Sequence, residues 1–246
     1  MPPIPPMVQP STFTTVAFVA VVAAVAVMIV WGFAIAGRRE SAAHSRAWAV
    51  RAGLGVAAWL TFTGVVSGSG VLESPGLPPR AMFFLVGCNV VALGLALSRP
   101  GTLLIKGLPI AALVGFAAYR LPLELVLHQW YVEGVLPVQM TYVSRNLDIL
   151  SGVLGLMGGL WLWRRGTSRP LVWAVNLVGM GLLLNVGAIA VLSSPFPFRV
   201  FTNDPAVLLI FHFPYGWILP MCVAPALAGH VLVFRWLWQT RGGAGS

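Results

Sequence analysis

Charged residues are scarce in this 246-residue chain. They make up 9% of it, whereas hydrophobic residues make up 58%. Soluble domains carry roughly 25% charged residues, so this composition excludes an ordinary soluble fold. Only six residues are acidic, and Lys106 is the single lysine. We therefore expect an integral membrane protein whose main partner is the lipid bilayer.

Cysteines are few, and catalytic motifs are absent from the sequence. Cys88 and Cys222 both fall within apolar segments, which excludes a disulfide between exposed loops and is typical of small core residues. The sequence contains no GxSxG, HExxH, CxxC or glycine-rich phosphate-binding motif. Retinal proteins need a lysine in their last helix, and ceramidase-type membrane hydrolases need a closely spaced histidine pair. Neither is present, so composition and motifs assign no reaction and no cofactor.

Long apolar runs are what the chain does contain. Each run approaches the roughly 20 residues that a spanning helix needs. We expect an all-α, seven-transmembrane-helix bundle in a single membrane domain over residues 14–238. The predicted helices cover residues 14–36, 48–67, 81–98, 107–131, 138–163, 171–193 and 206–234. The Pro-rich residues 1–13 and the Gly-rich residues 239–246 are expected to be disordered.

Lysine and arginine predict the orientation, because they are retained on the cytoplasmic side of a membrane. Eleven of the fifteen lie near the ends of the first, third, fifth and seventh predicted helices. The N-terminus is therefore predicted to lie outside and the C-terminus in the cytoplasm. The net charge of +9 follows from this retention. Because the arginines are scattered singly at helix ends, no nucleic-acid partner is expected.

Ionisable residues inside the apolar runs mark the candidate site. Arg120, Glu124 and His128 recur at i, i+4 and i+8, which predicts one shared face of the fourth helix. Arg145 and Asp148 are three residues apart and are predicted to share a face of the fifth helix. Counting about 1.5 Å per residue from the helix ends puts these groups toward the outer side of the bilayer.

Antiparallel packing of these two helices would allow Arg120 to meet Asp148 and Glu124 to meet Arg145, with Asn185 of the sixth helix at the same height. One interpretation is structural, because paired buried charges fix the register of two helices. The alternative is functional, because ionisable residues inside a membrane mark binding sites by default. In that alternative, the five residues line a periplasm-facing pocket in which the two arginines hold an anionic group of a small ligand.

Two further alternatives stay open. His128 and His212 both fall near the outer boundary, and neutral imidazole is the commonest metal ligand. Together with Glu124 and Asp148 they would supply ligands for a metal or haem, making the protein an enzyme or redox protein. The other alternative is a structural subunit, which requires a larger membrane complex or a homo-oligomer. These hypotheses differ in class, and composition does not choose among them.

Glycines in the predicted fifth helix indicate how it packs. Gly152, Gly155 and Gly159 follow one another at helical spacing. Small residues at this spacing let two membrane helices approach closely. We therefore expect a tight contact between this helix and a neighbour.

A resemblance to uncharacterised multi-span bacterial membrane proteins is carried by three segments. They read RLPLELVLHQWYVEG at 120–134, PVQMTYVSRNLDILSG at 137–152 and NDPAVLLIFHFPYGWILP at 203–220. The resemblance covers the fourth, fifth and seventh predicted helices. It implies the inner membrane of a bacterium and no particular reaction. The leading hypothesis is thus a protein that binds, senses or transports a small ligand at an outward-facing polar site.

Overall fold

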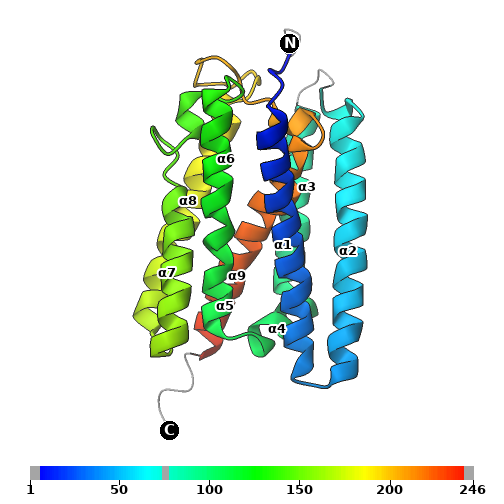
Figure 1. Cartoon of the computed structure of the whole chain (residues 1–246), viewed down its shortest axis with the longest axis vertical. Helices are drawn as coiled ribbons and strands as arrows, with labels where there is room; N and C mark the ends of the chain where they lie inside the picture. The colour runs from blue at the N-terminus through cyan, green and yellow to red at the C-terminus, as the bar shows by residue number, and fades with distance from the viewer. Residues whose placement is uncertain (1–5, 74–77, 241–246) are drawn as a thin grey trace.

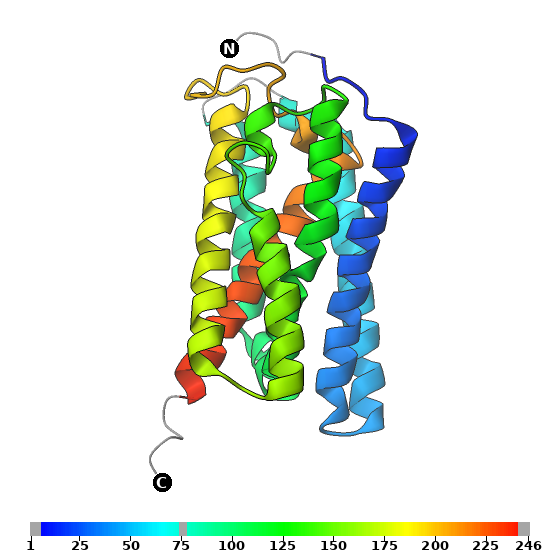
Figure 2. The ribbon, with the colours of Figure 1, turned by 60° about the vertical axis from the view of Figure 1, so that its left-hand side comes forward.

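The apolar runs of the sequence form α-helices that lie side by side in an elongated bundle (Figures 1 and 2). The computed structural model describes residues 6–73 and 78–240. Helices suit a bilayer because they satisfy their own backbone hydrogen bonds where no water is present. The elements are α1 Thr12–Arg38, α2 Ala42–Gly68, α3 Arg80–Leu97, α4 Arg99–Gly107, α5 Ile110–Gly115, α6 Arg120–Val132, α7 Ile149–Arg165, α8 Arg169–Ser193 and α9 Ala224–Gln239.

Six helical segments of the described residues are long and apolar enough to cross a membrane. They are Thr12–Arg38, Ala42–Gly68, Arg80–Leu97, Ile110–Val132, Arg169–Ser193 and Tyr215–Gln239. These segments overlap six of the seven predicted spans, and the all-α class is confirmed. The fourth combines α5, a 3₁₀ turn over Phe116–Tyr119 (η2) and α6. The last includes a π-helical segment, Ile218–Val223, ahead of α9.

The fifth predicted span differs from the structure. The prediction began it at residue 138, whereas α7 begins at Ile149 and is 17 residues long. Local hydrogen bonds explain the difference. The Asn146 side chain donates to the Met140 carbonyl (2.9 Å) and accepts from the Asp148 amide (3.0 Å). Such bonds compete with a helical ladder, so the prediction that Arg145 and Asp148 share a helical face is wrong.

The start of the chain is tied to the bundle where the structure describes it. Met7 is buried, Ser11 caps α1, and α1 begins at Thr12. Of the termini predicted to be disordered, residues 1–5 and 241–246 lie outside the described residues. The described part of the N-terminal segment thus has defined contacts.

Close packing of α7 on the chain from α5 to α6 confirms the glycine prediction. A Cβ added at Gly152 would lie 2.6 Å from the backbone nitrogen of Leu121. At Gly159 it would lie 2.9 Å from the Cα of Gly115. Neither position has space for a side chain, so these glycines bring α7 against the helix that carries the ionisable residues.

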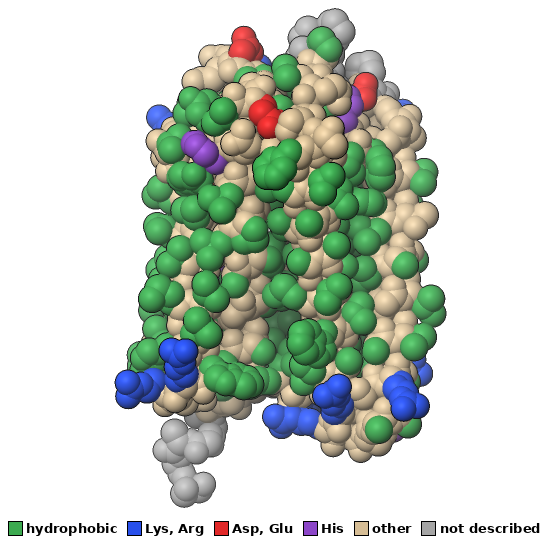
Figure 3. All heavy atoms as spheres, in the orientation of Figure 1, with side chains coloured by type: hydrophobic (Ala, Val, Ile, Leu, Met, Phe, Trp, Pro, Cys, Tyr) green, Lys and Arg blue, Asp and Glu red, His purple; other side chains and the backbone are tan. Residues whose placement is uncertain are grey.

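Basic residues gather at one end of the bundle, at the bottom of Figure 3. Arg38 ends α1, Arg165 ends α7, and Arg169 begins α8. α1 begins at the opposite end, where its first turn contacts Glu133. α9 finishes at the basic end (Figure 1). This separation of charge gives the bundle two chemically distinct ends.

Candidate functional site

Arg120 and Asp148 form a buried ion pair. Arg120 opens α6, and Asp148 immediately precedes α7. Their Nη2 and Oδ2 atoms are 2.6 Å apart, and each side chain is only 3% exposed. Ser151, one turn into α7, donates its hydroxyl to Oδ1 of Asp148 (2.9 Å). The predicted pairing is therefore confirmed, although the carboxylate stands at a helix start and not within a helix.

Glu124 has a different partner from the one predicted. It accepts a hydrogen bond from the Asn146 side-chain amide (2.8 Å), and the expected pairing with Arg145 is wrong. Asn146 is fully buried and also satisfies the backbone of the segment that leads into α7. Sequence reasoning missed this residue because a continuous helix was assumed there. The feature of the sequence that could have identified Asn146 is its position in a short polar segment, between Arg145 and Asp148.

Arg145 lies outside this buried network. Its side chain is exposed, and its guanidinium stands 5.2 Å from the ring centre of Phe201. The side chain of Asn185 donates a hydrogen bond to the backbone carbonyl of Arg145 (2.9 Å). The two residues are therefore in contact, but the Arg145 side chain takes no part in it. The structure thus brings Arg120, Glu124 and Asp148 together and leaves the second arginine at the surface.

The two histidines of the metal alternative lie in separate surroundings. His128 packs against Tyr142, with ring centres 4.7 Å apart. His212 places Nδ1 3.9 Å from a carboxylate oxygen of Glu73. Within residues 6–73 and 78–240, no three His, Cys, Asp or Glu side chains are grouped closely enough to hold a metal ion. The set of His128, His212 and Glu124 gains no support from this geometry and stays a prediction.

A second buried polar contact joins α8 to α9. His230 Nδ1 lies 2.8 Å from Oδ1 of Asn176, and the Asn176 amide donates to the His230 carbonyl (3.2 Å). A Cβ at Gly179 would lie 2.6 Å from the His230 ring, so the ring fills the space that this glycine leaves. Sequence analysis did not identify this buried pairing.

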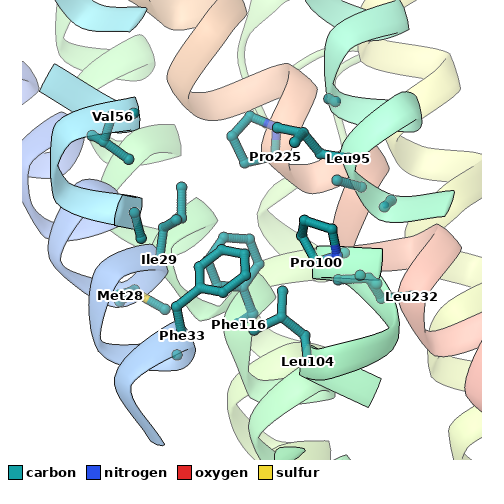
Figure 4. A pocket seen from close by; sticks show the side chains of 18 of the residues that line it. Met28, Ile29, Phe33, Val56, Leu95, Pro100, Leu104, Phe116, Pro225 and Leu232 are labelled. Atoms are coloured by element: carbon teal, nitrogen blue, oxygen red, sulfur yellow. The ribbon is translucent and has the colours of Figure 1, made fainter. Parts of the chain in front are cut away.

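An apolar cavity lies elsewhere in the bundle. It encloses about 550 Å³ between α1 and α2 on one side and α3, α4 and α9 on the other. Figure 4 shows Ile29 of α1 and Val56 of α2 facing Leu95 of α3 and Pro225 of α9 across it. Its α1 wall runs from Met28 toward the end of that helix, which places the cavity in the basic half of the bundle.

Exposed wall residues mark where this cavity opens. Arg51 and Gly55 of α2 and Val91 and Leu95 of α3 line the cavity and are exposed. In the described part of the chain α2 packs mainly against α1, without comparable contact to α3. All four residues belong to segments of membrane-spanning length. The opening between α2 and α3 therefore lies on the lateral surface of the bundle.

Comparison with known proteins adds no family to this description. No family model, curated protein or solved structure matches the chain. The closed polar network and the open apolar cavity are the two features from which a function can be inferred. They differ in chemistry, since the first consists mainly of polar side chains that bind one another and the second is lined mainly by apolar side chains.

Proposed function

We propose that this protein binds a long-chain, lipid-soluble molecule inside the membrane, in the apolar cavity beside α2 and α3. The single observation that carries the proposal is the cavity itself. Ligand sites enclose about 300–1,000 Å³ and are lined mainly by apolar and aromatic side chains. The 550 Å³ cavity meets both conditions, and Trp31, Trp48 and Trp59 stand among its lining residues. A ligand would enter sideways from the bilayer.

The polar network supports a structural role better than a ligand site. Arg120 is already paired with Asp148, and Glu124 with Asn146, in surroundings closed to solvent. Buried charge pairs hold neighbouring elements in one register. In this proposal the network fixes α6 against α7. The binding of an anion by Arg120, Arg145 and their neighbours stays a prediction.

We also propose a seven-crossing topology in a bacterial inner membrane, with the start of α1 outside and the end of α9 in the cytoplasm. α7 would serve as the seventh crossing. Two observations support this. α1 begins and α9 finishes at opposite ends of the bundle, which requires an odd number of crossings. Basic residues, which mark the cytoplasmic side, gather where α9 finishes. The cavity then lies in the cytoplasmic half.

Binding of a fluorescent long-chain alcohol to the protein in phosphatidylcholine nanodiscs tests the proposal. We expect saturable binding that the unlabelled alcohol displaces. Gly55→Phe places a large side chain at the cavity opening, where a Cβ meets no atom within 4 Å, and should weaken binding at least tenfold. Gly53→Phe is the matched control, because it lies on the same helix, is equally unobstructed and does not line the cavity. Equal binding by both variants would contradict the proposal.

A further inference from the structure

The lining of this cavity includes one charged side chain among its apolar ones. Arg51 is the only charged residue among the described residues that line it. It stands nine residues after Ala42, the first residue of α2, so it lies about 13 Å along the helix from the basic end. An arginine at that depth is far enough from the helix end to meet a molecule that occupies the cavity opening.

Arg51 is held in position by aromatic rings and carries no counter-ion. Its guanidinium lies 5.4 Å from the ring centre of Trp48, a cation–π contact. Trp48 stacks in turn on Phe33, with ring centres 5.8 Å apart and planes 16° from parallel. All three residues line the cavity. The ion pairs found in the described residues do not include Arg51. Its positive charge is thus fixed at the opening and unneutralised.

A cation beside an apolar cavity selects a particular kind of ligand. Guanidinium N–H groups bind carboxylate and phosphate oxygens with strong, charge-assisted hydrogen bonds. Hydrocarbon walls take an acyl or similar chain. Arg38 and Arg46, at the adjoining ends of α1 and α2, add positive potential at the same end of the bundle. Anionic amphiphiles are therefore attracted to this side and neutral ones are not.

We propose that the ligand of the cavity is a single-chain amphiphile with an anionic head group, and that Arg51 binds this head group while the chain fills the space between α1, α2, α3 and α9. This inference rests on the proposed function and specifies its ligand. The Trp48 ring orients the guanidinium and excludes water from one of its faces. The ligand then lies with its head toward the basic end and its chain toward the middle of the bundle.

The test compares oleic acid with oleyl alcohol as competitors for the fluorescent long-chain alcohol. Measurements use phosphatidylcholine nanodiscs, at a pH where the acid is ionised. We expect the protein to bind the acid about tenfold more tightly than the alcohol, as a charge-assisted hydrogen bond predicts. Arg51→Gln should abolish this preference by weakening the binding of the acid about tenfold, with a smaller effect on the alcohol, whose hydroxyl carries no charge. Arg51→Lys should keep part of the preference, because the positive charge remains.

Arg46→Gln is the control, because Arg46 is an exposed arginine of α2 that does not line the cavity. It should retain the preference for the acid. The inference is overturned if the unsubstituted protein binds acid and alcohol equally, or if Arg51→Gln keeps the full preference. Absence of saturable binding of either compound would instead refute the proposed function. Saturable alcohol binding by Arg51→Gln also shows that this variant is folded.

Discussion

Burial gives Asp148 and Glu124 opposite roles, although both are carboxylic acids beside one arginine. Asp148 neutralises Arg120 at 2.6 Å. Glu124 is in none of the ion pairs of the described residues, and accepts the amide of Asn146. An unpaired carboxylate inside a protein costs several kcal/mol. We therefore expect Glu124 to be protonated and neutral, which leaves the three ionisable groups with no net charge.

Two conservative substitutions check this assignment. Glu124→Gln keeps a neutral acceptor for Asn146, so the free energy of unfolding should change by less than about 1 kcal/mol. Asp148→Asn leaves Arg120 buried without a counter-ion, which should lower the free energy of unfolding by about 3–5 kcal/mol. Denaturant titration of the purified variants measures both values. A loss of similar size in the two variants would mean that Glu124 is ionised and needed for its charge.

Individual polar residues were only partly predictable from the sequence. Helical spacing and height were enough to pair Arg120 with Asp148, because both stay near the positions that a regular helix gives them. Asn146 was not recognised, since its role depends on a break in the helix that its own hydrogen bonds help to create. Hydropathy shows that the segment before α7 is mostly apolar, but it does not predict which backbone groups the polar side chains of that segment bind.

The start of α1 is stabilised by a carboxylate from another element. Glu133, just after α6, accepts hydrogen bonds from the backbone amide (2.9 Å) and hydroxyl (2.8 Å) of Ser11 and from the hydroxyl of Thr14 (3.0 Å). Partial burial by itself raises the pKa of Glu133, but these hydrogen bonds outweigh it and hold the pKa below the ordinary value of 4.5. Negative charge at a helix start also complements the helix dipole.

The depressed pKa fixes the direction of a pH effect. Glu133 stabilises the fold fully above pH 4.5, its pKa when unfolded, and this stabilisation is lost as the pH falls through the lower pKa of the folded state. We expect Glu133→Gln to lower the melting temperature by a few degrees at neutral pH, because it weakens the cap. The difference between the variant and the unsubstituted protein should shrink in acid. Melting curves at several pH values measure it, and a pH-independent difference would contradict the assignment.

At the scale of the whole molecule, the proposed topology depends on whether α7 crosses the membrane. Both native cysteines are buried, so an introduced surface cysteine reports its own position. Ser144, before α7, and Thr167, after it, are both exposed. In intact cells, a membrane-impermeant maleimide should label Ser144→Cys, whereas Thr167→Cys should react only after permeabilisation. Labelling of both in intact cells would mean that α7 does not cross, and the reverse pattern would invert the orientation.

The cavity is a property of the whole bundle and had no signal in the sequence. Apart from Arg51, its lining residues are ordinary apolar side chains and glycines on elements far apart in the chain, from α1 to α9. Periodicity predicts that such residues are buried, but it does not predict that α2 and α3 stand apart. Spans were predictable because each depends on a local run of residues, whereas a void depends on how several spans pack together.

The cap on α1 also sets an order of events during synthesis. Ser11 and Glu133 are 122 residues apart, so the first helix emerges long before the carboxylate that completes its start. At 5–20 residues per second, the ribosome needs roughly 6–24 s to reach Glu133. During that interval Ser11 lacks its contacts with the carboxylate, and its hydroxyl has only its local hydrogen bonds with Thr14, in the first turn of α1. The start of α1 is thus completed only when the chain has been translated through α6 to Glu133, and α7, α8 and α9 are made after that point.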